Sequence, residues 1–210
     1  MNAATQKITL QGGAGLIEAL LDLPADAPCG TAVIAHPHPL FGGTMTNKVV
    51  QTLARAFVQT GWRAVRFNFR GVGASAGVYD EGRGEAADML EVIRQVAPEG
   101  PLAVAGFSFG AFVTSHVVAD LAPRQPEKIV LVGTAASRFT VAPIAPQLHD
   151  RTLVLHGEQD DTVVLSSVMD WARPQSLPVT VIPGVEHFFH GQLPLLKSLV
   201  VRHLLAPAQA

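Results

Sequence analysis

The stretch at residues 101–118, PLAVAGFSFGAFVTSHVV, constrains the fold of this chain more than any other part of its sequence. A short apolar run at 102–105 has the length of a strand, and a longer one at 111–119 can form a buried helix. Between them, the pattern G-x-S-x-G contains Ser108. Such a serine occupies a sharp strand-to-helix turn, where flanking glycines let neighbouring backbone approach closely. We therefore predict that Ser108 is an exposed nucleophile.

The helix that follows Ser108 is expected to point its first backbone amides at the serine hydroxyl. These amides have no acceptor within the helix and lie at the positive end of its dipole, so they suit an oxyanion. Phe109, directly after the serine, is expected to supply one of the two donors. Because G-x-S-x-G is common by chance, the assignment also needs a base and an acid later in the chain.

Length and composition narrow the class of protein. A chain of 210 residues suits one domain, here 1–210, and 48% hydrophobic against 15% charged residues favours a compact α/β protein. A net charge of −2 without a lysine or arginine block argues against a nucleic-acid partner. The single cysteine, Cys29, excludes an internal disulfide and a cysteine-rich metal site.

The sequence also bears on the compartment. Its start, MNAATQKITL, lacks the apolar core of a signal peptide, and no uncharged apolar run reaches the ~18 residues of a membrane span. We expect a cytoplasmic protein with no membrane partner. The oligomeric state stays open.

Short apolar runs alternate with helical patterns along the chain. This alternation predicts a mostly parallel central sheet with helices on both faces, and an antiparallel strand pair at its start. The segment between 132 and 151 is too short for a large lid. The expected strands are 7–10, 16–23, 31–35, 63–69, 102–105, 128–132, 151–155 and 179–182, and the expected helices are 47–60, 84–96, 111–119, 165–171 and 193–205.

Two further polar loops complete a possible catalytic group. In a sheet of this kind, sites form at the carboxyl ends of the strands. Asp160 follows the strand at 151–155, and His187 follows the strand at 179–182. The histidine would take the proton of Ser108 as general base, and the aspartate would hold its tautomer and stabilise the imidazolium.

These features together resemble the α/β-hydrolase superfamily, in particular the small bacterial hydrolases related to dienelactone hydrolases. The resemblance covers nearly the whole chain. Dienelactone hydrolases use a cysteine nucleophile, whereas this chain has Ser108, so their substrate is not carried over. The resemblance rests on HPHPLFGGTMTNKVV (36–50), RFNFRGVGASAG (66–77), AGFSFGA (105–111), HGEQDDTV (156–163) and GVEHFFHG (184–191).

The resemblance also assigns the acid and the base. The acid pattern of such hydrolases, similar to G-x-x-D-x-x-V, selects Asp160, with the adjacent Asp161 as the alternative. The pattern H-F-F-H-G gives the role of base to the first histidine, His187, rather than to His190.

The second oxyanion donor should lie in the loop after the strand at 31–35. Since the two prolines of this loop have no amide, the candidates are His38, Leu40 and Phe41. Similarity to the loop of dienelactone-type hydrolases selects Leu40.

We expect no metal and no cofactor. His36 and His38 have no evident third ligand nearby, and histidines in a proline-rich loop more often bond to neighbouring backbone. Residues 71–76 match G-x-G-x-x-A, a dinucleotide signature, but no helix starts there. The same residues resemble R-G-x-G-x-S, a loop that α/β-hydrolases carry after this strand.

The expected function is hydrolysis of carboxylic esters or thioesters with small or short-chain acyl groups, through an acyl-enzyme on Ser108. Two other classes stay open: a non-catalytic binding protein with the hydrolase fold, and a nucleotide-dependent enzyme that uses the glycine loop at 71–77. The side chains expected to line the cleft are Phe41, Met45, Phe112 and Phe188.

Overall fold

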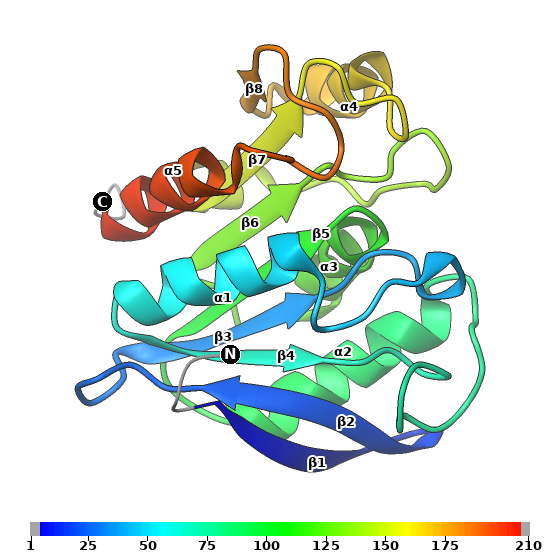
Figure 1. Ribbon diagram of the computed structural model, residues 1–210, viewed down its shortest axis with the longest axis vertical. Helices are drawn as coiled ribbons and strands as arrows, with labels where there is room; N and C mark the ends of the chain where they lie inside the picture. Colours follow the sequence, from blue (N-terminus) through cyan, green and yellow to red (C-terminus); the bar gives the residue numbers. More distant parts are fainter. Residues whose placement is uncertain (1–4, 207–210) are drawn as a thin grey trace.

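A computed structural model describes residues 5–206 and contains one eight-stranded sheet (Figure 1). The strands lie in the order β1-β2-β4-β3-β5-β6-β7-β8. β1 pairs antiparallel with β2, β2 pairs antiparallel with β4, and all other pairs are parallel. The predicted fold class is therefore confirmed. The strands are β1 (Gln6–Gly12), β2 (Gly15–Asp22), β3 (Gly30–Ala35), β4 (Trp62–Phe67), β5 (Leu102–Phe107), β6 (Lys128–Val132), β7 (Thr152–Gly157) and β8 (Val179–Ile182).

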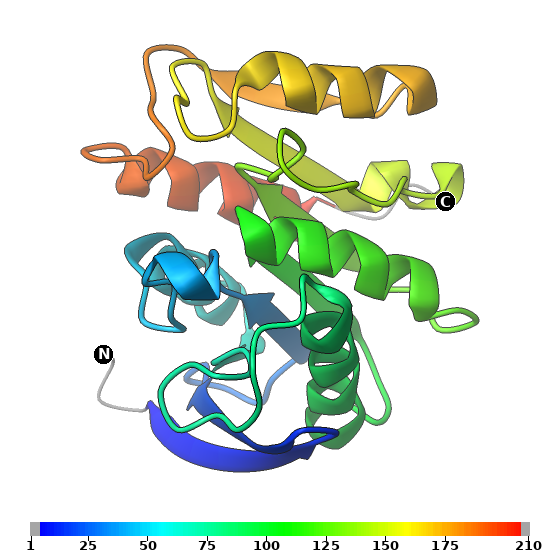
Figure 2. The ribbon, with the colours of Figure 1, turned by 90° about the vertical axis from the view of Figure 1, so that its right-hand side faces the viewer.

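Helices cover both faces of this sheet, as the edge-on view in Figure 2 shows. One face packs against α1 (Lys48–Gln59) and α5 (Leu193–Leu205), which also contact each other. The other face packs against α2 (Arg83–Val96), α3 (Phe109–Asp120) and α4 (Leu165–Ala172). A strand covered on both faces is largely apolar, which is why β5 is a continuous hydrophobic run and β6 is one after its first residue, Lys128.

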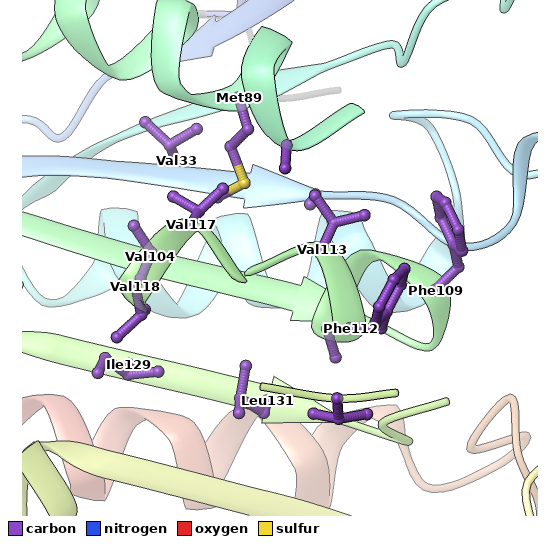
Figure 3. Close-up of a cluster of buried hydrophobic side chains, with 14 of the residues drawn as sticks. Val33, Met89, Val104, Phe109, Phe112, Val113, Val117, Val118, Ile129 and Leu131 are labelled. Atoms are coloured by element: carbon purple, nitrogen blue, oxygen red, sulfur yellow. The ribbon is translucent and has the colours of Figure 1, made fainter. Parts of the chain in front are cut away.

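The core around α3 positions the nucleophile (Figure 3). On this helix Val113 and Val117 are fully buried, and they belong to one cluster with Val104 of β5, Ile129 of β6 and Met89 of α2. Burial of each such side chain stabilises the fold by roughly 1.5–3 kcal/mol. The helix packs on β5 at the centre of the sheet and against the neighbouring α2, and these contacts hold its first turn in place.

Several element boundaries differ from the predicted ones, and in two places a side chain that takes a backbone amide is the reason. β4 ends at Phe67 rather than residue 69. The Asn68 amide still donates to Glu18 O of β2, but the Phe69 amide donates to the His36 ring instead of to a strand. The proline-rich loop after β3 contains a short 3-10 helix at Pro39–Phe41, which was not among the predicted elements. A proline at the start of a helical turn removes only an amide that would have no partner there.

Buried ion pairs fix the loop between β4 and α2. Arg66 pairs with Asp22 at 2.7 Å and donates to the Met45 carbonyl, so it links β2, β4 and the segment before α1. Arg70 forms two 2.8 Å bonds with Asp88 of α2. Bidentate arginine–carboxylate pairs hold a fixed geometry, so this loop is anchored at the edge of the site.

No helix within residues 5–206 has the length and apolar character needed to cross a membrane.

His36 ties the end of β3 to the end of β4 and carries a testable pH dependence. Its Nδ1 lies 2.6 Å from Pro37 O, and its Nε2 accepts from the Phe69 amide at 3.0 Å. Complete burial disfavours the imidazolium and lowers the pKa of His36 from 6.5 to about 4. The unfolded chain therefore binds a proton between these pH values while the folded chain does not.

Stability should accordingly be full above pH 6.5 and fall as the pH drops towards 4. From pH 7.5 to pH 5, this one group should remove about 2 kcal/mol from the free energy of unfolding. Urea denaturation at both pH values measures the loss. In His36→Asn, which cannot titrate, the loss should be smaller by about that amount. An equal loss in both proteins would contradict this assignment.

Candidate active site

Ser108 occupies a strained turn between β5 and α3. Its backbone has φ 57° and ψ −116°, which a residue with a side chain rarely adopts, at a cost of about 1–3 kcal/mol. A Cβ on Gly106 would overlap the carbonyl of Gly110, and a Cβ on Gly110 would overlap the carbonyl of Ala35. Both glycines of the pattern are thus required by close backbone contacts.

His187 lies directly against this serine. It comes from the loop between β8 and α5, and its Nε2 is 3.0 Å from Ser108 Oγ. Its Nδ1 is 2.6 Å from Asp160 Oδ2. Because a carboxylate only accepts, Nδ1 must carry the proton, which leaves Nε2 free to accept from the serine hydroxyl. Gly133 leaves room for the ring, since a Cβ there would come within 3.2 Å of His187 Cε1.

Asp160 is held from both oxygens. It follows β7, is 4% exposed, and accepts at Oδ1 from the amides of Thr162 at 3.0 Å and Val163 at 2.7 Å. Oδ2 remains for His187. The neighbouring Asp161 is exposed, and its carboxylate lies 3.4 Å from the Thr162 hydroxyl. The structure therefore brings Asp160, and not Asp161, together with His187.

A second buried histidine lies behind this carboxylate. His156 Nε2 is 2.8 Å from Val163 O and 3.5 Å from Asp160 Oδ2. Burial is the largest cause that lowers the pKa of His156, so the ring is neutral at pH 7. Its position beside Asp160 was not foreseen from the sequence. No motif marks it, since the contact depends on how the turn at 158–163 folds back.

The geometry contradicts the prediction that Leu40 supplies an oxyanion donor. Its amide donates to Nδ1 of the His38 ring at 3.2 Å, and its side chain lies outside the pocket. The amides of His38 and Phe109 have no acceptor among residues 5–206, and both residues line the pocket with Ser108. The tight turn that starts the 3-10 helix uses the Leu40 amide, which loop similarity could not reveal.

A pocket of about 290 Å³ opens over Ser108. Phe41 and Phe188 line it as predicted, but Met45 is buried away from it, and Phe112 stacks on Phe139 in a neighbouring hollow. Its walls come from the loops after five strands. The lining residues are Pro37, His38, Phe41, Gly42, Gly43, Asn47, Ser108, Phe109, Ala135, Arg138, Phe139, Thr162, Val163, His187 and Phe188.

The other histidines near the site bond locally. His36 and His38 contact neighbouring backbone, as the sequence predicted. His190 pairs with Glu186 on the surface and not with Ser108. Within the part of the chain that the structure describes, no three histidine, cysteine, aspartate or glutamate residues gather where they could hold a metal ion.

Comparison with known proteins gives the family of the chain. The model of the family described as serine aminopeptidase, S33, matches residues 27–150. The chain belongs to this family of α/β hydrolases. An uncharacterized protein of Rickettsia prowazekii is 30% identical over 199 residues, which cover 87% of this chain and 82% of that protein.

Two solved structures extend the similarity over the fold. An α/β serine hydrolase without a lid from Xanthomonas campestris is 34% identical, with a TM-score of 0.87, covering 100% of this chain and 99% of that one. An α/β serine hydrolase homologue from Coxiella burnetii is 37% identical, with a TM-score of 0.81, covering 96% and 97%. These relatives support hydrolytic activity. A relationship to dienelactone hydrolases in particular remains a prediction.

The two adjacent aspartates give a direct test of the site. Asp160→Asn keeps the size but removes the acceptor for His187 Nδ1–H, so kcat should fall by on the order of 10⁴-fold. Asp161→Asn changes an exposed side chain and should cost less than about tenfold. Steady-state kinetics of both variants on one p-nitrophenyl ester decides between them. If Asp161→Asn is the crippled variant, the assignment is off by one residue.

Proposed function

We propose that this hydrolase cleaves carboxylic esters or thioesters of small or short-chain acyl groups through an acyl-enzyme on Ser108. One observation carries the proposal. Ser108, His187 and Asp160 form a continuous hydrogen-bonded chain, with 3.0 Å and 2.6 Å between successive partners, at the base of a pocket open to solvent. This arrangement is the one that activates a serine hydroxyl.

In the first half of the reaction, Ser108 Oγ attacks the acyl carbon while His187 Nε2 takes its proton. Asp160 stabilises the resulting imidazolium and is itself held by two backbone amides. The carbonyl oxygen gains negative charge and would accept from the amides of Phe109 and His38. Each such donor contributes roughly 10²–10³-fold to kcat in enzymes of this kind. His187 then donates its proton to the departing alcohol or thiol.

In the second half, a water takes the place of the leaving group. His187 removes a proton from this water, the hydroxide attacks the acyl carbon, and the collapse of the second tetrahedral intermediate returns the proton to Ser108 Oγ. His187 therefore acts as base and acid in turn. The neutral His156 behind Asp160 adds no positive charge that would compete for the carboxylate.

The pocket supports a small acyl group. Its volume of about 290 Å³ lies at the lower end for ligand sites, and four phenylalanines among its lining residues favour apolar groups. The matching family model is described as a serine aminopeptidase. An aminopeptidase must bind a free ammonium group, however, and no aspartate or glutamate is among the lining residues that the structure describes. This charge pattern favours an ester over a peptide N-terminus.

A non-catalytic binding protein with this fold is the alternative. A binding role needs no strained serine and no free amides beside it, so the energy stored at Ser108 favours a catalyst. A fluorophosphonate probe separates the two, because it reacts only with an activated serine.

The native protein should therefore be labelled by the probe and hydrolyse p-nitrophenyl acetate or butyrate. In Ser108→Ala labelling should disappear and kcat should fall by at least ~10³-fold. Ser166→Ala, which changes an exposed serine on α4, is the matched control and should behave like the native protein. A folded Ser108→Ala protein that retains near-native turnover would overturn the proposed function.

A further inference from the structure

Arg138 gives the pocket a net positive character. It follows β6 and lines the pocket together with Ser108. Among the lining residues that the structure describes, it is the only lysine or arginine, and none of them is an aspartate or glutamate. The carboxylate of Asp160 lies below the pocket, because Asp160 is only 4% exposed and its oxygens are bonded to two amides and to His187. A ligand in the pocket therefore meets one accessible cation.

The guanidinium of Arg138 is available to a ligand. It is exposed, and among residues 5–206 it forms no ion pair and no side-chain hydrogen bond, unlike Arg66 or Arg70. Glu81 lines a second open hollow on the other side of Arg138, yet the two side chains make no ion pair. The charge is thus not neutralised within the fold.

Arg138 lies close to the side of the pocket formed by His38 and Phe109, the two residues whose amides are free. Its charge contributes, after burial, to lowering the pKa of His38, so its field reaches that residue. The ring of Phe109 contacts the ring of His38, with 4.8 Å between centroids, and the ring of Phe139, the residue after Arg138, with 5.2 Å between centroids. The cation and an aromatic wall therefore lie on the same side of Ser108.

We propose that Arg138 is a subsite for an anionic group of the substrate, so that the preferred esters carry a carboxylate in addition to the bond that is cleaved. The proposal rests on the serine-hydrolase function proposed above. A guanidinium matches a carboxylate with two parallel hydrogen bonds, and aromatic walls hold the apolar part between the carboxylate and the ester. The carboxylate can belong to the acyl side or to the alcohol side.

A second role for the same charge must be separated from this one. A cation near the amides of Phe109 and His38 could also stabilise the oxyanion, which would accelerate every ester alike and act on kcat. A subsite instead discriminates between charged and neutral esters, mainly through KM. The ratio of kcat/KM for an anionic ester to that for its neutral twin distinguishes the two roles.

Two pairs of substrates test each side of the ester. For the acyl side, the p-nitrophenyl monoester of adipic acid is compared with methyl p-nitrophenyl adipate, in which only the free carboxylate is masked as a methyl ester. For the alcohol side, 4-acetoxybenzoate is compared with methyl 4-acetoxybenzoate. Rates with Ser108→Ala are subtracted as background. In the native protein, at least one anionic ester should have a kcat/KM roughly tenfold higher than its neutral twin.

Arg138→Gln should lower that ratio by roughly tenfold, and Arg138→Glu should invert it. Added salt should weaken the native preference, because the pair is partly exposed. Arg94→Gln, which removes an exposed arginine of α2 paired with Glu91, is the matched control and should keep the native ratio. Equal losses on charged and neutral esters in Arg138→Gln, or no native preference in either pair, would overturn the subsite.

These outcomes are distinct from a failure of the proposed function. If neutral esters are cleaved in a Ser108-dependent way without any charge preference, only the subsite is wrong. If no ester in either pair is cleaved in a Ser108-dependent way, both proposals fall together.

Discussion

The strained backbone of Ser108 is the constraint on which the site depends. Its left-handed conformation persists because β5 lies at the centre of the sheet and α3 is packed both on that sheet and against the neighbouring α2. Neither element can shift without opening apolar core, so the turn between them cannot relax. The glycines that flank it let the carbonyl of Ala35 and the first turn of α3 approach. The packing of β5 and α3 therefore holds the hydroxyl group of Ser108 in a fixed position.

The charged and polar groups around Ser108 place negative charge below the pocket and positive charge towards it. The buried carboxylate of Asp160 is bonded by two amides and His187, and the neighbouring His156 is neutral. Above it, the free amides of Phe109 and His38 present partial positive charge to the pocket. Arg138 adds a full positive charge at the rim. The field inside the pocket is therefore arranged for an oxygen that becomes negative, and it suits anionic rather than cationic ligands.

Much of the fold could be predicted because buried parallel strands and amphipathic helices leave strong periodic patterns. The strand at 128–132, the strand at 179–182 and the helix at 193–205 have their predicted bounds. Two of the differences arise where a side chain takes a backbone amide, once from a distant segment and once within the same loop. β4 ends early because the imidazole of His36, distant in the sequence, takes the Phe69 amide. The 3-10 turn at Pro39–Phe41 appears because His38 folds back onto Leu40.

By itself, the sequence determined the fold class, the strand-turn-helix around Ser108, and the loops that hold Asp160 and His187. Those features depend on local patterns and on the order of elements along the chain. Only the tertiary structure decided which aspartate reaches His187, which amides stay free, and that His156 and Arg138 border the site. Each of these depends on the direction of a side chain or an N–H in a loop. Such directions are set by contacts between segments far apart in the sequence, which no local pattern records.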